Sequence, residues 1–253
     1  MAILKGGYPT YGQPIGIIML ECAFPRPPGD IGNARSFDFP VRYEILEGIV
    51  AARLTKEEEP TAVAALIQAA QRLERAGARI ILTSCGLFLR YQARLAAAVK
   101  VPVATSAVLF LPFLTALLPS GRKVGVLTAD SRTLSPVLER TGWNDPGRVV
   151  IEGMEDYPAF RRAILDPASP YDLDPLALRG EAIQAVQCLL KREPAVAILL
   201  VECTNLSPYS SALREAFGLP VFDMIDLARL LHGAACELGP LTRLETPRHA
   251  RSD

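Results

Sequence analysis

Two cysteines, Cys85 and Cys203, occupy equivalent positions in two similar stretches of the chain. Each ends a short apolar run, is followed six residues later by a tyrosine, and is followed 17 residues later by a Pro-Val pair. When residues 79–109 are aligned with 197–227, nine of 31 positions are identical. Two thiols placed equivalently in two related halves are expected to face one cleft, where one acts as a base and the other as an acid.

The ends of buried strands are suitable places for a reactive thiol. Backbone N–H groups and the positive end of a following helix both favour the thiolate there. The alternative is that such a cysteine is only a small buried hydrophobic residue, although two matched positions favour the chemical role. The chain has two histidines, His232 and His249. A Cys–His pair is therefore open only to His232, and a histidine-based metal site is not expected.

Small polar residues near these strand ends are the candidate substrate-binding residues. Backbone N–H groups and short side chains can hold a carboxylate there and stabilise enolate-like charge. The loop 27–33, rich in proline and glycine, can add a nest of N–H groups, or it is an ordinary surface turn. The candidates are Asn33, Ser84, Gly86, Thr105, Thr128, Glu202, Thr204, Asn205 and Tyr91.

Several of these side chains have a second interpretation. Glu202 can anchor a cationic group or orient a neighbour, or it can cap the next helix. Tyr91 and its counterpart Tyr209 can line the cleft or pack in the core. Arg90 is expected on a solvated helix face, so we expect the substrate carboxylate to be held without an arginine fork. Cys22, Cys188 and Cys236 lack the strand-end context of the other two cysteines. Cys188 and Cys236 fall in predicted helices and are expected in the core.

The elements that must position these residues alternate between strands and helices. Short apolar runs are typical of buried parallel strands, and longer stretches with a period of 3.6 predict helices. The predicted strands are 15–20, 43–48, 80–83, 102–104, 124–128, 149–152, 196–201 and 221–222. The predicted helices are 61–75, 89–99, 106–118, 131–140, 176–191, 210–217 and 225–238. Gly77 is expected just after the first helix, and Pro112 is expected to kink the third or start its regular part.

This alternation predicts βαβ units and a parallel sheet, with reactive groups beyond the carboxyl ends of the strands. Together with the internal match, it predicts an α/β fold of two pseudo-symmetric lobes, each a short parallel sheet flanked by helices. The active site is expected in the interlobe cleft. We expect lobe 1 to comprise 1–104 and 225–253, and lobe 2 to comprise 105–224, with one of the two cysteines in each. The charged tail from Pro240 is expected to be frayed.

Composition excludes several classes of function. The 253 residues carry no net charge, and half of them are hydrophobic. No nucleic-acid or membrane partner is therefore expected, and no apolar stretch approaches the roughly 20 residues of a membrane span. Five scattered cysteines without a CxxC pair, and no signal-like beginning, predict a cytoplasmic protein with free thiols. No phosphate-binding fingerprint occurs, so no nucleotide or pyridoxal phosphate is expected, and without a histidine-rich ligand set no catalytic metal is expected. A homodimer is compatible with these features.

The segments Thr83-Ser84-Cys85-Gly86 and Glu202-Cys203-Thr204-Asn205 resemble the aspartate/glutamate racemase superfamily, which includes hydantoin racemase, maleate isomerase and arylmalonate decarboxylase. The loop 29–33 and the pair Tyr91-Gln92 resemble a branch that is also similar to algal dimethylsulfoniopropionate lyases. The resemblance extends over most of the chain. It implies two pseudo-symmetric α/β lobes with the active site between them, no pyridoxal phosphate or metal, and two cysteines acting on opposite faces of a substrate α-carbon.

The segments after the two cysteines also depart from one branch of that superfamily. Glutamate racemases carry Asn-Thr after the first cysteine and Thr-His after the second, where this chain has Gly86-Leu87 and Thr204-Asn205. The missing histidine argues against glutamate as the substrate, while the general two-thiol chemistry is less affected.

These patterns together favour a cofactor-independent enzyme that transfers a proton at the α-carbon of a small carboxylate, as an amino-acid racemase does, with Cys85 and Cys203 as its acid–base pair. Loss of a β-leaving group from the same carbanion would instead make the enzyme a lyase. Two further alternatives stay open. One is a non-catalytic protein that closes on a small acid, and the other is a redox sensor in which the two thiols form a reversible disulfide.

Overall fold

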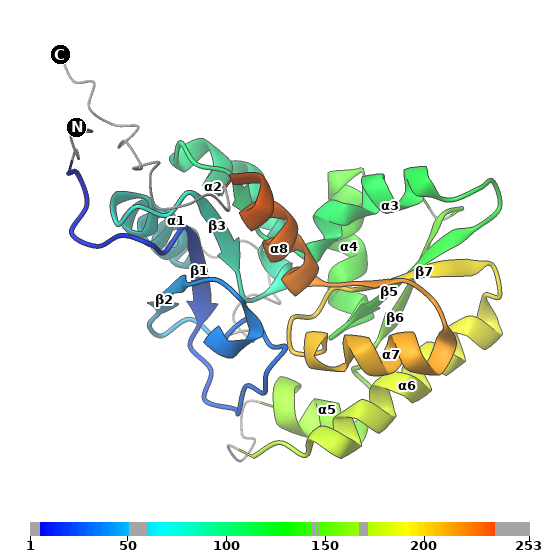
Figure 1. Cartoon of the computed structure of the whole chain (residues 1–253). Coiled ribbons are helices and arrows are strands. Elements are labelled where there is room, and N and C mark those ends of the chain that lie inside the picture. Colours follow the sequence, from blue (N-terminus) through cyan, green and yellow to red (C-terminus); the bar gives the residue numbers. More distant parts are fainter. Residues whose placement is uncertain (1–5, 51–59, 143–144, 146, 167–171, 236–253) are drawn as a thin grey trace.

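The fold contains two parallel β-sheets of four strands each (Figure 1). It is seen in a computed structural model that describes residues 6–50, 60–142, 145, 147–166 and 172–235. The first sheet consists of β1 (Ile15–Leu20), β2 (Val41–Leu46), β3 (Ile80–Thr83) and β4 (Val103–Ala104). The second sheet consists of β5 (Lys123–Thr128), β6 (Val149–Gly153), β7 (Val196–Val201) and β8 (Val221–Phe222). The predicted α/β fold with two related parallel sheets is confirmed.

The two sheets have the same strand order. The first runs β2-β1-β3-β4 and the second runs β6-β5-β7-β8. The match extends to single hydrogen bonds beyond the ends of β3 and β7. The Ser84 N–H donates to the Ile18 carbonyl at 2.9 Å, and the Glu202 N–H donates to the Leu127 carbonyl at 2.8 Å. The residues that precede the two cysteines are therefore held at equivalent places in the two sheets.

Helices cover the outer faces of both sheets and occupy part of the space between them (Figure 1). The first helix buries an apolar stripe against the first sheet, and Gly77 follows it with a φ of 96°, as predicted. The α-helices are α1 (Pro60–Arg75), α2 (Gln92–Ala98), α3 (Leu111–Leu117), α4 (Ser131–Thr141), α5 (Pro158–Phe160), α6 (Pro175–Arg192), α7 (Ser210–Phe217) and α8 (Met224–Ala235). The tighter or wider turns are η1 (Ala34–Ser36), η3 (Gly86–Tyr91), η4 (Ala107–Phe110), η5 (Arg161–Leu165) and η6 (Ser207–Tyr209).

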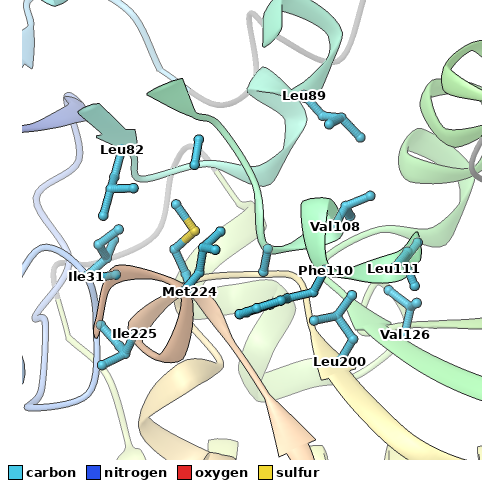
Figure 2. Packing of buried hydrophobic residues seen from close by; sticks show 14 of the residues in the cluster. Ile31, Leu82, Leu89, Val108, Phe110, Leu111, Val126, Leu200, Met224 and Ile225 are labelled. Atoms are coloured by element: carbon cyan, nitrogen blue, oxygen red, sulfur yellow. The ribbon is translucent and has the colours of Figure 1, made fainter. Parts of the chain in front are cut away.

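A single apolar core joins the two halves. It includes Leu82 of the first sheet, Val126 and Leu200 of the second, and Met224 at the start of α8 (Figure 2). Two other clusters of buried residues line the outer faces of the sheets, one beneath α1 and the other beneath α6. Because the middle core draws on both sheets, the ends of β3 and β7 belong to one packed unit.

Two predicted helices begin later than expected. Residues 86–91 form the 3-10 segment η3, and regular helix starts only at α2. This segment serves two cores, since Leu89 packs between the sheets whereas Phe88 and Tyr91 pack beneath α1. The same happens in the next helix, where η4 precedes α3 and Pro112 lies in the first turn of α3. The prediction that this proline starts the regular part is confirmed.

Some predictions fall outside the described residues or remain untested. The frayed tail from Pro240, Cys236 and His249 all lie outside the described part. The boundaries of the two lobes stay a prediction, although α8 does contact β3 and η4. Among the described residues, no helix is both long enough and apolar enough to cross a bilayer.

Candidate active site

The two cysteine-bearing segments are joined by a hydrogen bond. Cys85 follows β3 by two residues, and Cys203 follows β7 by two residues. The hydroxyl of Thr204, next to Cys203, donates to the carbonyl oxygen of Ser84, next to Cys85, at 2.6 Å. Both thiols are free, with Cys203 buried and Cys85 half-buried. The segments predicted to carry the chemistry therefore meet between the two sheets.

A carboxyl group from the second half lies against the first cysteine segment. The Oε2 atom of Glu202 accepts a hydrogen bond from the Thr128 hydroxyl at 2.7 Å. A Cβ atom built on Gly86 would come within 1.6 Å of Oε1 of Glu202 and 3.2 Å of the Ser106 hydroxyl oxygen. Only glycine leaves room for the carboxyl group at this position. Two predicted site residues, Gly86 and Glu202, are thus in direct contact.

Burial and charge both work against thiolate formation. The pKa of the Cys85 thiol is raised to about 12, first by burial and then by the Glu202 carboxylate. The same two causes, in the same order, raise the pKa of Cys203 well above its ordinary value. The N–H groups of Leu87 and Asn205 lower the two pKa values, as expected at strand ends, but by less. The expected lowering of the thiol pKa values is therefore wrong, because desolvation outweighs the favourable dipoles.

The Glu202 carboxyl group is also strongly perturbed. Burial raises its pKa to about 7, and the Thr128 hydrogen bond opposes that rise. The other oxygen, Oε1, is buried and has no hydrogen-bond partner among the described residues. Near neutral pH this carboxyl group is therefore present in both its protonated and its ionised forms.

Other predicted binding residues use their polar groups inside the protein. The Ser84 hydroxyl accepts from the Leu20 N–H at 2.9 Å. The Thr105 hydroxyl donates to Oε1 of Gln92 at 2.8 Å. Tyr91 is buried beneath α1, and its hydroxyl has no partner among the described residues. Core packing is therefore the better description of Tyr91, and Ser84 and Thr105 hold the first segment in shape.

Asn33 stabilises the loop that follows β1. Its side-chain amide donates to the Arg26 carbonyl at 2.7 Å, and its side-chain oxygen accepts from the Arg35 N–H at 2.9 Å. Gly29, with a φ of 102°, lies so close to the second half that a Cβ would come within 2.6 Å of Pro208. This loop is therefore more than a surface turn, because it packs against the segment that follows Cys203.

Charged residues of the same loop reach the second half, and the sequence reasoning missed them. Arg26 forms an ion pair with Asp30 at 2.8 Å, and both side chains are largely buried. The same guanidinium nitrogen donates to the side-chain oxygen of Asn205 at 3.5 Å. The i, i+4 spacing of opposite charges within an otherwise apolar, glycine-rich loop is the signal that could have identified this pair. Asn205, a predicted site residue, thus has a cationic neighbour from the other half.

The structure also describes the surroundings of Cys22, Cys188 and His232. The charge of Cys22 contributes to the raised pKa of Cys85, so Cys22 is a third thiol near the site. Its position two residues after β1, at the same sheet edge, is the signal that could have identified it.

Cys188 is exposed on α6, so its expected core position is wrong. The ring of His232 stacks on that of Phe39, with the ring centroids 3.9 Å apart. No group of metal-ligating residues is found among the described residues.

Three relatives show what the chain is similar to. A dimethylsulfoniopropionate lyase from Durusdinium sp. clade D is 26% identical over 83% of this chain and 71% of that protein. Dimethylsulfoniopropionate lyase 3 from Emiliania huxleyi (strain CCMP1516) is 31% identical over 83% of this chain, and the chain spans 57% of that protein. The structure of an aspartate racemase from Picrophilus torridus has a TM-score of 0.55 at 19% identity, covering 92% of this chain and 96% of that chain.

The structural likeness at this identity supports the fold, and the sequence match carries the assignment. Residues 45–229 match the model of the family described as Asp/Glu/Hydantoin racemase. The match includes both cysteine segments and extends over well more than half of the chain. The chain therefore belongs to the Asp/Glu/hydantoin racemase family.

Proposed function

We propose that the protein catalyses cofactor-independent proton transfer at the α-carbon of a small carboxylate substrate, with Cys85 and Cys203 as the acid–base pair. The hydrogen bond from the Thr204 hydroxyl to the Ser84 carbonyl carries this proposal, because it ties the two cysteine segments together at 2.6 Å. Membership of the racemase family supports the same chemistry.

In the proposed reaction, one cysteine acts as a thiolate and removes the α-proton from one face of the substrate. The other cysteine, as a thiol, returns a proton to the opposite face, and the configuration of the carbon is inverted. The Leu87 and Asn205 N–H groups, which already favour anionic sulfur, supply the hydrogen bonds that the thiolates need. Because both thiols have raised pKa values, substrate binding must also help to create the thiolate.

The substrate carboxylate is proposed to lie against short polar groups of the two cysteine segments. Asn205 is the candidate donor on the second half, because the one proton of the Thr204 hydroxyl is already donated to the Ser84 carbonyl. On the first half the candidate is the Leu87 N–H, since the space beside Gly86 is filled by the Glu202 carboxyl group. Arg26 beside Asn205 is a second candidate for the carboxylate, although Asp30 already pairs with its charge at 2.8 Å. Kinetics of the Arg26→Gln and Asn205→Ala variants distinguish the two candidates. The KM should rise strongly only in the variant that lacks the group holding the carboxylate.

A second candidate function is that of a lyase. The observation that favours it is the match to dimethylsulfoniopropionate lyases, which extends over 83% of this chain. The initial step would be the same removal of a proton next to a carboxylate. If the substrate carries a leaving group on the β-carbon, the resulting carbanion would expel it and form an alkene, and no second proton transfer would be needed.

Proton NMR in D2O with a panel of amino acids, hydroxy acids and β-substituted acids distinguishes these reactions. A racemase exchanges the α-proton for deuterium, whereas a lyase produces new alkene signals. The double variant Cys85→Ser/Cys203→Ser should lose either signal, and Cys188→Ser should keep it, because Cys188 is an exposed thiol on α6. Binding of an acid without exchange or elimination would instead support a non-catalytic protein.

A further inference from the structure

The carboxyl group of Glu202 lies beside both cysteine segments. Glu202 directly precedes Cys203 in the chain, and its Oε1 atom occupies the space that a Cβ of Gly86 would need. Gly86 directly follows Cys85. The side chain therefore extends from the second half onto the first at the point where the two thiols are held.

The two oxygens of this carboxyl group have different surroundings. Oε2 accepts a hydrogen bond from the Thr128 hydroxyl at 2.7 Å, which fixes the orientation of the group. Oε1 is fully buried, and the described residues provide it with no hydrogen-bond partner. An ionised carboxylate that is buried with an unpaired oxygen is unfavourable, so this position suits a group that gains a proton.

The ionisable groups around Glu202 make a second negative charge still less favourable. Cys85 belongs to the first half and Cys203 to the second, and the Glu202 charge raises the pKa of both thiols. Asp30 lies near Cys203 and adds negative charge, although Arg26 pairs with it. Two further groups act on Cys85: Cys22 raises its pKa, and Arg90 lowers it.

We propose that Glu202 is the positioning residue of the thiol pair, whose carboxylate takes up the proton that a cysteine releases, so that the site carries one negative charge throughout. In this step the S–H bond of a cysteine breaks and an O–H bond forms at Oε1 of Glu202. The negative charge moves from oxygen to sulfur, and no proton leaves the site. This inference rests on the proposed two-thiol function and adds the group that controls thiol ionisation.

Coupled groups of this kind titrate as a set. The first proton lost comes from Glu202, whose pKa is about 7. Once Glu202 is ionised, each thiol resists ionisation, because a second charge would be created nearby. Replacing Glu202 by glutamine removes that charge and keeps the shape of the side chain. The thiols of the Glu202→Gln variant should therefore ionise at lower pH than those of the wild type.

The test measures alkylation of the full chain by iodoacetamide, followed by peptide mass spectrometry, between about pH 5.5 and pH 8.5, because only the thiolate reacts. At about pH 8.5 we expect Cys85 and Cys203 to react at least about tenfold faster in Glu202→Gln, which corresponds to a pKa difference of one unit. At about pH 5.5, where Glu202 is protonated in the wild type, the two proteins should react at the same rate.

Two variants and one internal reference make this result decisive. Glu193→Gln removes a carboxylate at the opposite end of β7, where it pairs with Lys123 at 2.6 Å, and should leave both rates unchanged. Exposed Cys188 provides the reference rate in every sample. Thr128→Val removes the hydrogen bond that lowers the Glu202 pKa. Glu202 of this variant should ionise at a higher pH, so alkylation of the thiols should be suppressed only from a higher pH than in the wild type.

Equal alkylation profiles in wild type and Glu202→Gln would overturn the inference. Faster alkylation of the variant at every pH would also overturn it, because that pattern indicates an opened structure and not a lost charge. If Glu202→Gln does not fold, a Thr128→Val profile that coincides with that of the wild type overturns it. The proposed reaction is tested separately: expected alkylation profiles with no exchange or elimination for any acid would reject the reaction but retain the role of Glu202.

Discussion

The residues on either side of the two cysteines differ, although the strands that carry them are equivalent. The first half has Ser84-Cys85-Gly86, and the second has Glu202-Cys203-Thr204. The short Ser84 side chain stays in its own half, where its hydroxyl accepts from the Leu20 N–H at 2.9 Å. The longer Glu202 side chain also binds its own half, through Thr128, but its second oxygen reaches Gly86 of the other half.

The positions after the cysteines show the same difference. Thr204 donates across the boundary to the Ser84 carbonyl, whereas Gly86 contributes no side chain and leaves space for Glu202. The second half therefore supplies the side chains of both contacts that cross between the two cysteine segments. The first half supplies the Ser84 carbonyl as acceptor and, at Gly86, a position without a side chain. The repeated sheets fix where the thiols lie. The two residues that flank each thiol give the two halves different roles.

Replacing either thiol is expected to have the largest effect. Cys85→Ser and Cys203→Ser should each reduce turnover by about 10²–10⁴-fold, because a serine hydroxyl cannot replace the thiolate as base near neutral pH. Each variant should keep its fold, since serine has nearly the size of cysteine. Chiral chromatography of the product measures this net turnover, with circular dichroism as the control for folding, and a single variant can still exchange the α-proton on one face. Wild-type turnover in both variants would show that the thiols are structural.

Stability should depend on pH through Glu202, which has no counterpart in the first half. Its pKa rises from 4.5 to about 7 on burial, so the folded state holds the proton more tightly. The resulting stability is complete at acidic pH and is lost as the pH rises through 7, by about 2–3 kcal/mol between about pH 5 and pH 8. Urea unfolding of wild type and Glu202→Gln at several pH values measures this difference directly.

Burial also raises the pKa values of Asp30 and Asp223. Subtracting the free energy of unfolding of Glu202→Gln from that of the wild type removes their effects. We expect the free energy of unfolding of the wild type, relative to Glu202→Gln, to fall as the pH rises. A difference that stays constant with pH would contradict the assignment of a raised pKa to this carboxyl group.

Adding one methyl group at Gly86 should disturb the contact that Glu202 makes with the first half. In Gly86→Ala the new Cβ would lie 1.6 Å from Oε1 of Glu202, so the carboxyl group must move. Overpacking of this kind destabilises by about 1–3 kcal/mol. Gly180→Ala is the matched control, because that glycine lies in α6 with open space around it and should gain up to about 1 kcal/mol of helix stability. Thermal unfolding of both variants checks the contrast, and equal shifts would contradict it.

The fold could be predicted from the sequence because its signals are local and repeated. Short apolar runs such as 15–20 and 196–201 identify buried strands, and the matched spacing after Cys85 and Cys203 identifies the two halves. The beginning of α2 could not be predicted in the same way. Residues 86–91 pack into two different cores, and that division depends on the position of the second sheet.

The candidate site was only partly predictable, for a similar reason. Sequence position identified Cys85, Cys203, Glu202 and Thr204 as neighbours of strand ends, but it could not show how the halves pair. The hydrogen bond from Thr204 to Ser84 joins residues 120 positions apart. The sign of the thiol pKa change was wrong, because it depends on burial, which local sequence does not reveal. Arg26 was missed because its partner Asn205 lies in the other half.

The smallest expected effect is a difference in reactivity between the two thiols of the wild-type protein. Cys85 is half-buried and has Arg90 nearby, which lowers its pKa, whereas Cys203 is buried and has Asp30 nearby, which raises its pKa. Cys85 should therefore react several-fold faster with iodoacetamide near neutral pH, since alkylation follows the thiolate fraction and access. Peptide mass spectrometry at short reaction times gives both rates in one sample, with exposed Cys188 as the reference. A faster Cys203 would reverse the assigned asymmetry, and it would indicate that the second half, which supplies the crossing contacts, also carries the more readily ionised thiol.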